Sequence, residues 1–147
     1  MLLEGIGGVL PGPAGEANSL ALHPRGRVLC LGPDVATQAV AATAQGNVAI
    51  VPAASLSALR HALGPAAALA AWTEREAALA DPALDGVLAG DDLADLRGVA
   101  LALAAREGAV VPLLVGEPAP EMLVRERTLS IDTTSAGGNV ALLAEAA

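Results

Sequence analysis

The 147-residue chain has no lysine, phenylalanine or tyrosine, and it contains a single tryptophan, Trp72. Its core must therefore be built from alanine, leucine and valine, because large aromatic side chains are almost missing. A single cysteine, Cys30, excludes an internal disulfide and is consistent with a reducing cytoplasm. No apolar run of about 20 residues is present to span a membrane, and the first residues lack the basic region of a signal peptide. We therefore expect a cytoplasmic protein without membrane contact.

Positive charge is also scarce. All eight basic residues are arginines, and sixteen acidic residues bring the formal net charge to −8. The arginines form no cluster, so an acidic surface would repel a phosphate backbone, and we expect no nucleic-acid partner. The two histidines, His23 and His61, are far apart and have no third ligand at a recognisable spacing. The sequence therefore predicts no metal site.

Apolar runs that end at Gly or Pro alternate with alanine-rich helical segments along most of the chain. The runs predict strands at 18–23, 27–31, 47–51, 66–72, 84–88, 109–115 and 128–131. The helical segments are 35–44, 55–63, 74–80 and 91–106, with a helical turn at 122–126. Alternating strands and helices favour parallel pairing with right-handed crossovers, so we expect an α/β fold, three-layered and Rossmann-like, with a mostly parallel sheet.

This pattern divides the chain into three parts. Residues 1–17, rich in Gly and Pro, are expected to be loop or extended chain. Residues 18–132 form the Rossmann-like domain, and 133–147 form a separate C-terminal segment. Within the domain, Asp34 is predicted to cap the helix that follows strand 27–31, and Asp91 or Asp92 to open the long helix. A phosphate at the Asp34 helix is the weaker alternative, since no Gly-x-Gly-x-x-Gly motif follows.

Two stretches carry a resemblance to a known family. The first begins with Leu10-Pro-Gly-Pro-Ala-Gly-Glu-Ala-Asn18 and continues through His23-Pro-Arg-Gly-Arg; the second contains Thr133-Thr-Ser-Ala-Gly-Gly-Asn139. Together they resemble the C-terminal region of long-form proline utilization A. Members of that family join a flavin-dependent proline dehydrogenase to an NAD-dependent pyrroline-5-carboxylate dehydrogenase. The resemblance implies that this chain is a degenerate aldehyde dehydrogenase nucleotide-binding domain, with FAD and NAD held by upstream domains of the parent polypeptide.

The residues that give such a dehydrogenase its chemistry are missing at the matching positions. The resemblance places Asp34 where the oxyanion-binding asparagine would stand, and Val51 where a lysine would meet the cofactor ribose. The segment that ends at Asp91 has lost its hydroxyl residues, and Glu117 lies outside the pattern of the general base. Cys30 sits in a predicted core strand, away from any histidine that would activate it. We therefore expect no catalytic, cofactor-binding or metal-binding residue in this chain.

The closing segment is the candidate interaction site. Its apolar residues could bury against another domain, and its Gly pair allows close backbone approach; a polar turn followed by a fraying terminus is the simpler reading. In the family, a very similar motif is associated with covering the internal tunnel, which favours docking. The predicted interaction residues are Thr133, Thr134, Ala136, Gly137, Gly138, Asn139, Leu142 and Leu143. The loop 10–18 is a second expected contact surface.

The resemblance thus predicts an interaction module rather than a whole enzyme. Its expected partner is the upstream aldehyde dehydrogenase domain of the same polypeptide, with a homodimer as a further possibility, and Met1 is expected to be an added start. The alternative is an NAD-binding domain that kept nucleotide affinity without catalysis. A free-standing enzyme would need a nucleophile or a base that the sequence does not offer.

Overall fold

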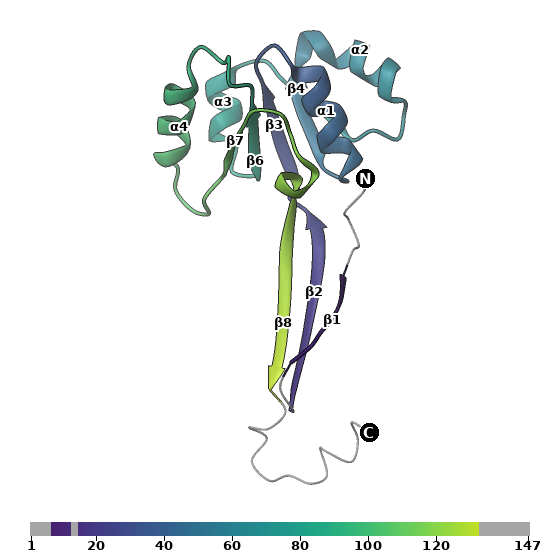
Figure 1. Ribbon diagram of the computed structural model, residues 1–147. Coiled ribbons are helices and arrows are strands. Elements are labelled where there is room, and N and C mark those ends of the chain that lie inside the picture. Colours follow the sequence, from purple (N-terminus) through teal and green to yellow (C-terminus); the bar gives the residue numbers. More distant parts are fainter. Residues whose placement is uncertain (1–6, 13–14, 133–147) are drawn as a thin grey trace.

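A computed structural model describes residues 7–12 and 15–132 of the chain (Figure 1). The elements that lead from the N-terminus to the middle of the chain are β1 (Gly7–Leu10), β2 (Glu16–Pro24), β3 (Arg27–Leu31), α1 (Val35–Ala44), β4 (Val48–Pro52), α2 (Ala53–Leu63) and β5 (Leu69–Trp72). They are followed by α3 (Arg75–Ala80), β6 (Gly86–Ala89), α4 (Leu96–Ala104), β7 (Leu113–Val115), the short 3-10 helix η1 (Pro120–Leu123) and β8 (Val124–Asp132). The strands form two separate sheets.

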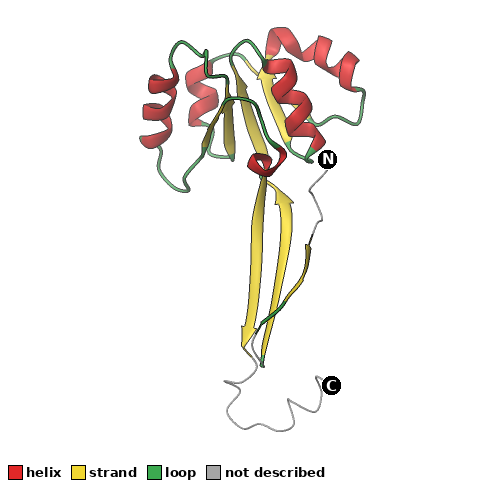
Figure 2. Cartoon of the chain, viewed as in Figure 1, coloured by secondary structure: helices red, strands yellow, loops and turns green. Residues whose placement is uncertain are grey.

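The larger sheet has five parallel strands in the order β5-β4-β3-β6-β7, and helices cover both of its faces (Figure 2). Alternate residues of β3 point to the two opposite faces of this sheet. Val28 and Cys30 pack with residues of α1 and α2, whereas Leu29 and Leu31 pack with residues of α3 and α4. This confirms the expected three-layer α/β fold with a parallel sheet. We call this part, with its helices, the body.

Small side chains set the packing of the body, as the composition required. Ala39 and Ala42 of α1 are completely buried, and all four residues of β6 are buried. Gln38, also on α1, is buried and donates a hydrogen bond from Nε2 to the carbonyl of Leu31 at 2.9 Å. The only tryptophan, Trp72, packs against the core under α3 and α4. The body therefore closes around a core in which this partly buried tryptophan is the one large aromatic side chain.

The smaller sheet is antiparallel, has the order β1-β2-β8, and projects from the body as a long arm (Figure 1). Its main pair runs from Pro24 opposite Val124, beside the body, to Glu16 opposite Asp132 at the far end. The strand β2 leads directly into β3, and β8 follows η1 at the end of the body. The two long strands of the arm therefore flank the body in sequence and meet beside it in space.

The arm accounts for the largest differences from the expected elements. Residues 7–10, expected to be loop or extended chain, form the paired strand β1. The expected helical turn at 122–126 ends at Leu123, and β8 begins at Val124, four residues before the expected strand. Residues 128–132 alternate polar with apolar side chains, which suits an exposed strand better than a helix. The sequence therefore contains a strand pattern at both ends of the domain.

Three elements of the body are clearly shorter than expected, and the first of them, β5, begins at Leu69 instead of residue 66. The strand β7 covers only residues 113–115 of the predicted 109–115, because Val110 is 94% exposed and Pro112 has no N–H to donate. The helix α4 begins at Leu96, so the expectation that Asp91 or Asp92 opens it is wrong. Asp95 is the cap instead, since its side chain accepts a hydrogen bond from the N–H of Gly98 at 3.1 Å.

Candidate interaction site

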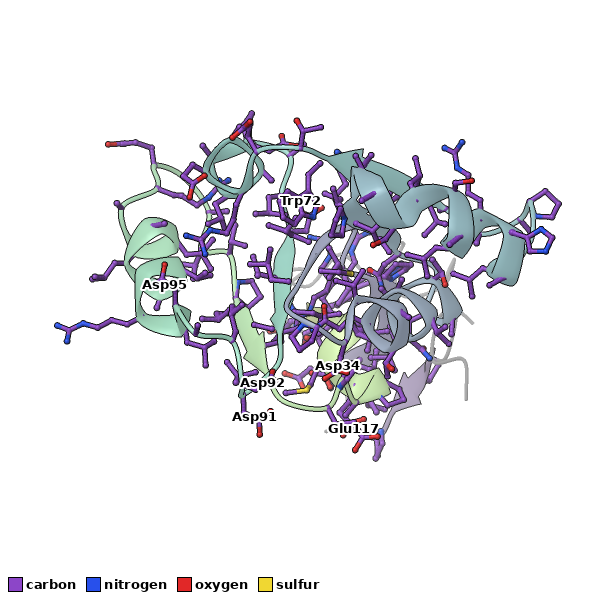
Figure 3. All side chains as sticks on the ribbon, turned by 90° about the horizontal axis from the view of Figure 1, so that it is seen from above. Asp34, Trp72, Asp91, Asp92, Asp95 and Glu117 are labelled. Atoms are coloured by element: carbon purple, nitrogen blue, oxygen red, sulfur yellow. The ribbon has the colours of Figure 1, made fainter. Side chains whose placement is uncertain are left out.

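The carboxyl edge of the parallel sheet is where a Rossmann-like fold places its ligands, and here it carries exposed carboxylates. Asp34 follows β3, Asp91 and Asp92 follow β6, and Glu117 follows β7 (Figure 3). The strand order reverses direction between β3 and β6, so Asp34 and Asp92 flank the position where a dinucleotide would lie. An atom added at Gly90 would meet Asp92 and lie 3.8 Å from the carboxylate of Asp34. The edge would therefore repel a pyrophosphate.

Three of these four carboxylates, all but that of Glu117, do not cap the helices that the sequence predicted for them. Asp34 stands at the N-cap position of α1, but its side chain makes no capping hydrogen bond, which corrects the predicted cap. Asp91 and Asp92 lie in the turn after β6 rather than at a helix start. Glu117 is an exposed loop carboxylate, as predicted. Among the described residues, no three His, Cys, Asp or Glu side chains are placed to hold a metal ion.

The groups that a dehydrogenase would use are unsuited to reaction. Cys30 is completely buried, and burial raises the pKa of its thiol from 9.0 to about 12, so the reactive thiolate is disfavoured. Val51 stands where the family resemblance would require a lysine. It is a fully buried core residue of β4, as expected of a strand residue. His23 lies on the arm and His61 on α2, both exposed. The only hydrogen bond of the Cys30 thiol among the described residues is to the carbonyl of Val28.

A hollow of about 510 Å³ lies between α3 and α4. Leu79, Val99 and small alanines form its apolar walls. Arg75 pairs there with Asp95 at 3.1 Å, and Arg106 donates hydrogen bonds to the carbonyls of Leu79 and Asp81. Both arginines are already engaged with other groups, and the carboxylates of Glu76 and Glu107 also line the hollow.

The arm has two chemically different faces. In an antiparallel sheet, residues opposite one another point to the same side, and so do residues two apart along a strand. The register places Val9, Ser19 and Leu129 in one row. The resulting face, which we call the basic face, includes Val9, Arg125, Arg127, Leu129 and Ile131, with Ala17, Ser19, Ala21 and His23 of β2 between them. No ion pair between described residues involves Arg125 or Arg127.

The opposite side, the acidic face, includes Leu10, Glu16, Leu20, Leu22, Glu126 and Asp132. The most exposed apolar side chains of the arm are on the basic face, where Val9 is 85%, Leu129 54% and Ile131 49% exposed. Exposed apolar side chains grouped on one face commonly mark a surface that another protein covers. Sequence reasoning missed this face, although Arg125, Arg127, Leu129 and Ile131 recur at every second residue and so signal one side of a strand.

One interaction segment expected from the sequence, residues 10–18, lies at the far end of the arm. Leu10 and residues 16–18 belong to β1 and β2 rather than to a loop, and Glu16 pairs with Asp132, the last described residue before the predicted docking motif. The motif itself, Thr133 to Leu143, lies outside the described residues. The described part of the chain also contains no helix of the length and hydropathy that a membrane span requires.

Comparison with known proteins decides which family this arrangement belongs with. The chain is 39% identical to the bifunctional protein PutA of Salmonella typhimurium over 145 residues, and 37% identical to that of Escherichia coli over 148 residues. It is homologous to a segment of PutA. Each match covers 92% of the chain, which spans about 11% of the length of these relatives. No family model matches.

Solved structures give the same answer. A crystal structure of a Bradyrhizobium japonicum PutA variant superposes with a TM-score of 0.60 at 30% identity, over 77% of this chain and 14% of that one. An NAD-dependent benzaldehyde dehydrogenase from Corynebacterium glutamicum superposes with a TM-score of 0.58 at 14% identity, over 76% of this chain and 28% of that one, which shows a shared fold alone. The expected resemblance to the aldehyde-dehydrogenase-like C-terminal region of PutA is confirmed.

Proposed function

We propose that the chain is a non-catalytic module of a bifunctional enzyme that converts proline to glutamate. In this proposal it packs on the aldehyde dehydrogenase domain of the same polypeptide and helps to close the channel that carries the semialdehyde intermediate. The homology to PutA supports the assignment to proline catabolism. The observation that carries the interaction role is the arm, whose apolar side chains are exposed on a sheet that has no core of its own.

The proposal that the chain does not catalyse a reaction is supported by the residues at the carboxyl edge of the large sheet. A dehydrogenase stabilises a developing oxyanion there with hydrogen-bond donors, and one such donor is worth about 3 kcal/mol. Asp34 and Asp92 offer negative charge at this edge instead. Because Cys30 is buried with a raised pKa, it cannot supply the attacking thiolate. The body therefore serves as a scaffold that holds the arm.

The basic face indicates what the arm would bind. Two arginines that form no ion pair with another described residue stand beside Leu129 and Ile131 on a chain whose net charge is −8. The matching surface would be apolar, with carboxylates positioned opposite Arg125 and Arg127, because arginine forms bidentate pairs with carboxylates. We place this surface on the aldehyde dehydrogenase domain; a second copy of the module is the alternative occupant.

The decisive experiment uses the enzyme that contains this chain, with residues 133–147 deleted. Formation of NADH from proline should show a lag and a lower coupled rate, because the intermediate escapes before it is oxidised. Each half-reaction, assayed with its own substrate, should keep its rate. A truncated enzyme with an unchanged coupled rate and no lag would contradict the role in closing the channel.

A second variant tests the arm. Replacing Arg125 and Arg127 by Glu in the same enzyme should weaken docking and produce a similar lag, while Arg97→Glu on exposed α4 serves as the matched charge control. Sedimentation of the double variant distinguishes the two occupants. Loss of oligomers would identify a second copy, whereas a lag without a change of mass would identify the domain of the same polypeptide.

The hollow between α3 and α4 favours one further candidate, a domain that retains nucleotide affinity without catalysis. Its apolar walls and its volume of about 510 Å³ could accept a flat aromatic base. Calorimetry of the chain with NAD tests this candidate. We expect no binding below millimolar concentrations, because the carboxylates at the adjacent edge oppose the pyrophosphate. Tighter binding that is lost in Leu79→Trp, which would fill the hollow, would establish the alternative.

A further inference from the structure

The arm and the body meet at one small region, which we call the joint. It consists of Arg25–Arg27, where β2 passes into β3, and residues 122–124, where η1 passes into β8. Both crossings lie side by side, since Pro24 pairs with Val124 (Figure 1). An arm connected by two unsupported crossings would swing freely about this region.

In the first crossing, however, the backbone N–H of each residue donates a hydrogen bond, and each of these bonds goes to a different segment of the chain. The N–H of Arg25 donates to the carbonyl of Leu123 at 3.3 Å, and that of Gly26 donates to Oδ1 of Asn47 at 3.0 Å. The N–H of Arg27 donates to Oδ2 of Asp85 at 2.8 Å. Three consecutive peptide groups are therefore tied to the second crossing, to the turn after α1 and to the loop before β6.

Asn47 connects the most segments. Its side chain is completely buried, and it also donates from Nδ2 to the carbonyl of Ala42 at 3.1 Å and to the carbonyl of Leu123 at 3.0 Å. One amide group thus joins α1, the first crossing and the second crossing. A buried amide with all its bonds made is specific in geometry, because any rotation of its partners would leave a polar group unpaired.

Two more contacts complete the joint. Arg25 donates from Nε to the carbonyl of Met122, which ties the first crossing to the second through a side chain. Gly26 has a φ of +125°, and a Cβ at this position would collide with the carboxylate of Asp85. The backbone therefore has no room to move toward β6.

We propose that the joint is a rigid coupling in which Asn47 and Arg25 are positioning residues that fix the angle between the arm and the body. The functional meaning rests on the proposed docking role. An arm held in its binding orientation loses less conformational freedom when it docks, and this preserves affinity. The joint thereby lets the body determine where the basic face is presented.

Distances between two spin labels measure this angle directly. Labels at Ala17→Cys on the arm and Ser57→Cys on α2 occupy exposed positions, while the native Cys30 is buried and out of reach. A strand rises about 3.3 Å per residue, so a swing of about 20° at the joint would move the Ala17 label by about 8 Å. We expect one narrow distance distribution in the doubly labelled chain.

Arg25→Met and Asn47→Ala should each broaden or shift that distribution, and Arg97→Met, an exposed arginine away from the joint, should not. Circular dichroism confirms that each variant is folded; if Asn47→Ala is not, Arg25→Met decides alone. An unchanged distribution in the folded joint variants would overturn the proposal, as would a broad distribution in the parent chain. No partner is present, so this result is independent of whether the docking role holds.

Discussion

The body and the arm use the same few residue types in opposite ways. In the body, every residue of β6 is buried and β3 supplies side chains to two cores. In the arm, Val124 is the only buried residue of β8, and Leu129 and Ile131 are exposed. The body therefore satisfies its own hydrophobic requirement, whereas an isolated three-stranded sheet needs something to pack against it. The contrast places the proposed interaction surface where the burial of apolar side chains is incomplete.

The most direct way to break this contrast is to remove a leucine from each region. Leu88→Ala in β6, where the side chain is 1% exposed, should lower the free energy of unfolding by about 3 kcal/mol. Leu129→Ala in the arm, at 54% exposed, should change it by less than about 0.5 kcal/mol. Urea denaturation of the chain measures both. Equal losses would mean that the arm already has a core in the free chain.

A smaller effect is expected at the boundary between the regions. Gly26→Ala should lower the free energy of unfolding by about 2 kcal/mol, because an alanine at φ +125° is strained and meets the Asp85 carboxylate. Gly8→Ala on β1, where nothing lies within 4 Å, is the matched control and should be nearly neutral. Thermal unfolding followed by circular dichroism compares them. A neutral Gly26→Ala would show that the backbone of the joint can relax.

The smallest expected effect is a pH dependence of stability that comes from the buried thiol of the body. Burial raises the pKa of Cys30 from 9.0 to about 12, so above pH 9 the unfolded chain loses a proton that the folded chain keeps. The stability is therefore fully present below pH 9 and falls as the pH rises toward 12. By about pH 10, the loss relative to Cys30→Ala should reach about 1.4 kcal/mol. Parallel pH profiles of the two proteins would argue that the thiol is accessible to water.

Sequence reasoning succeeded where structure is determined locally. The apolar runs bounded by Gly or Pro located β3, β4 and β6, and the helix 35–44 matches α1 at both ends. It was less accurate at α4, since Asp91, Asp92 and Asp95 are all plausible caps. The turn after β6 and the packing of α4 on the sheet decide in favour of Asp95, and neither is visible in a local pattern.

The arm was predicted only in part. The ranges 18–23 and 128–131 lie within β2 and β8, but they were expected to belong to the Rossmann-like domain, and β1, which contains two glycines, was not expected as a strand. Their pairing also joins the two ends of the domain, which no short window of sequence can reveal. The same holds for Asn47: the sequence places it at the start of the predicted strand 47–51, and only the fold brings Leu123 beside it.

The order β1-β2-β8 has a consequence for how the chain folds. The strand β2 comes before the whole body and β8 comes after it, so their pairing closes a very long loop, at a cost in chain entropy. Contacts of such high sequence separation form slowly. We expect the body to fold first and bring Pro24 and Val124 together. The pairs of β2 and β8 then form one after another, from this pair to Glu16 and Asp132 at the far end.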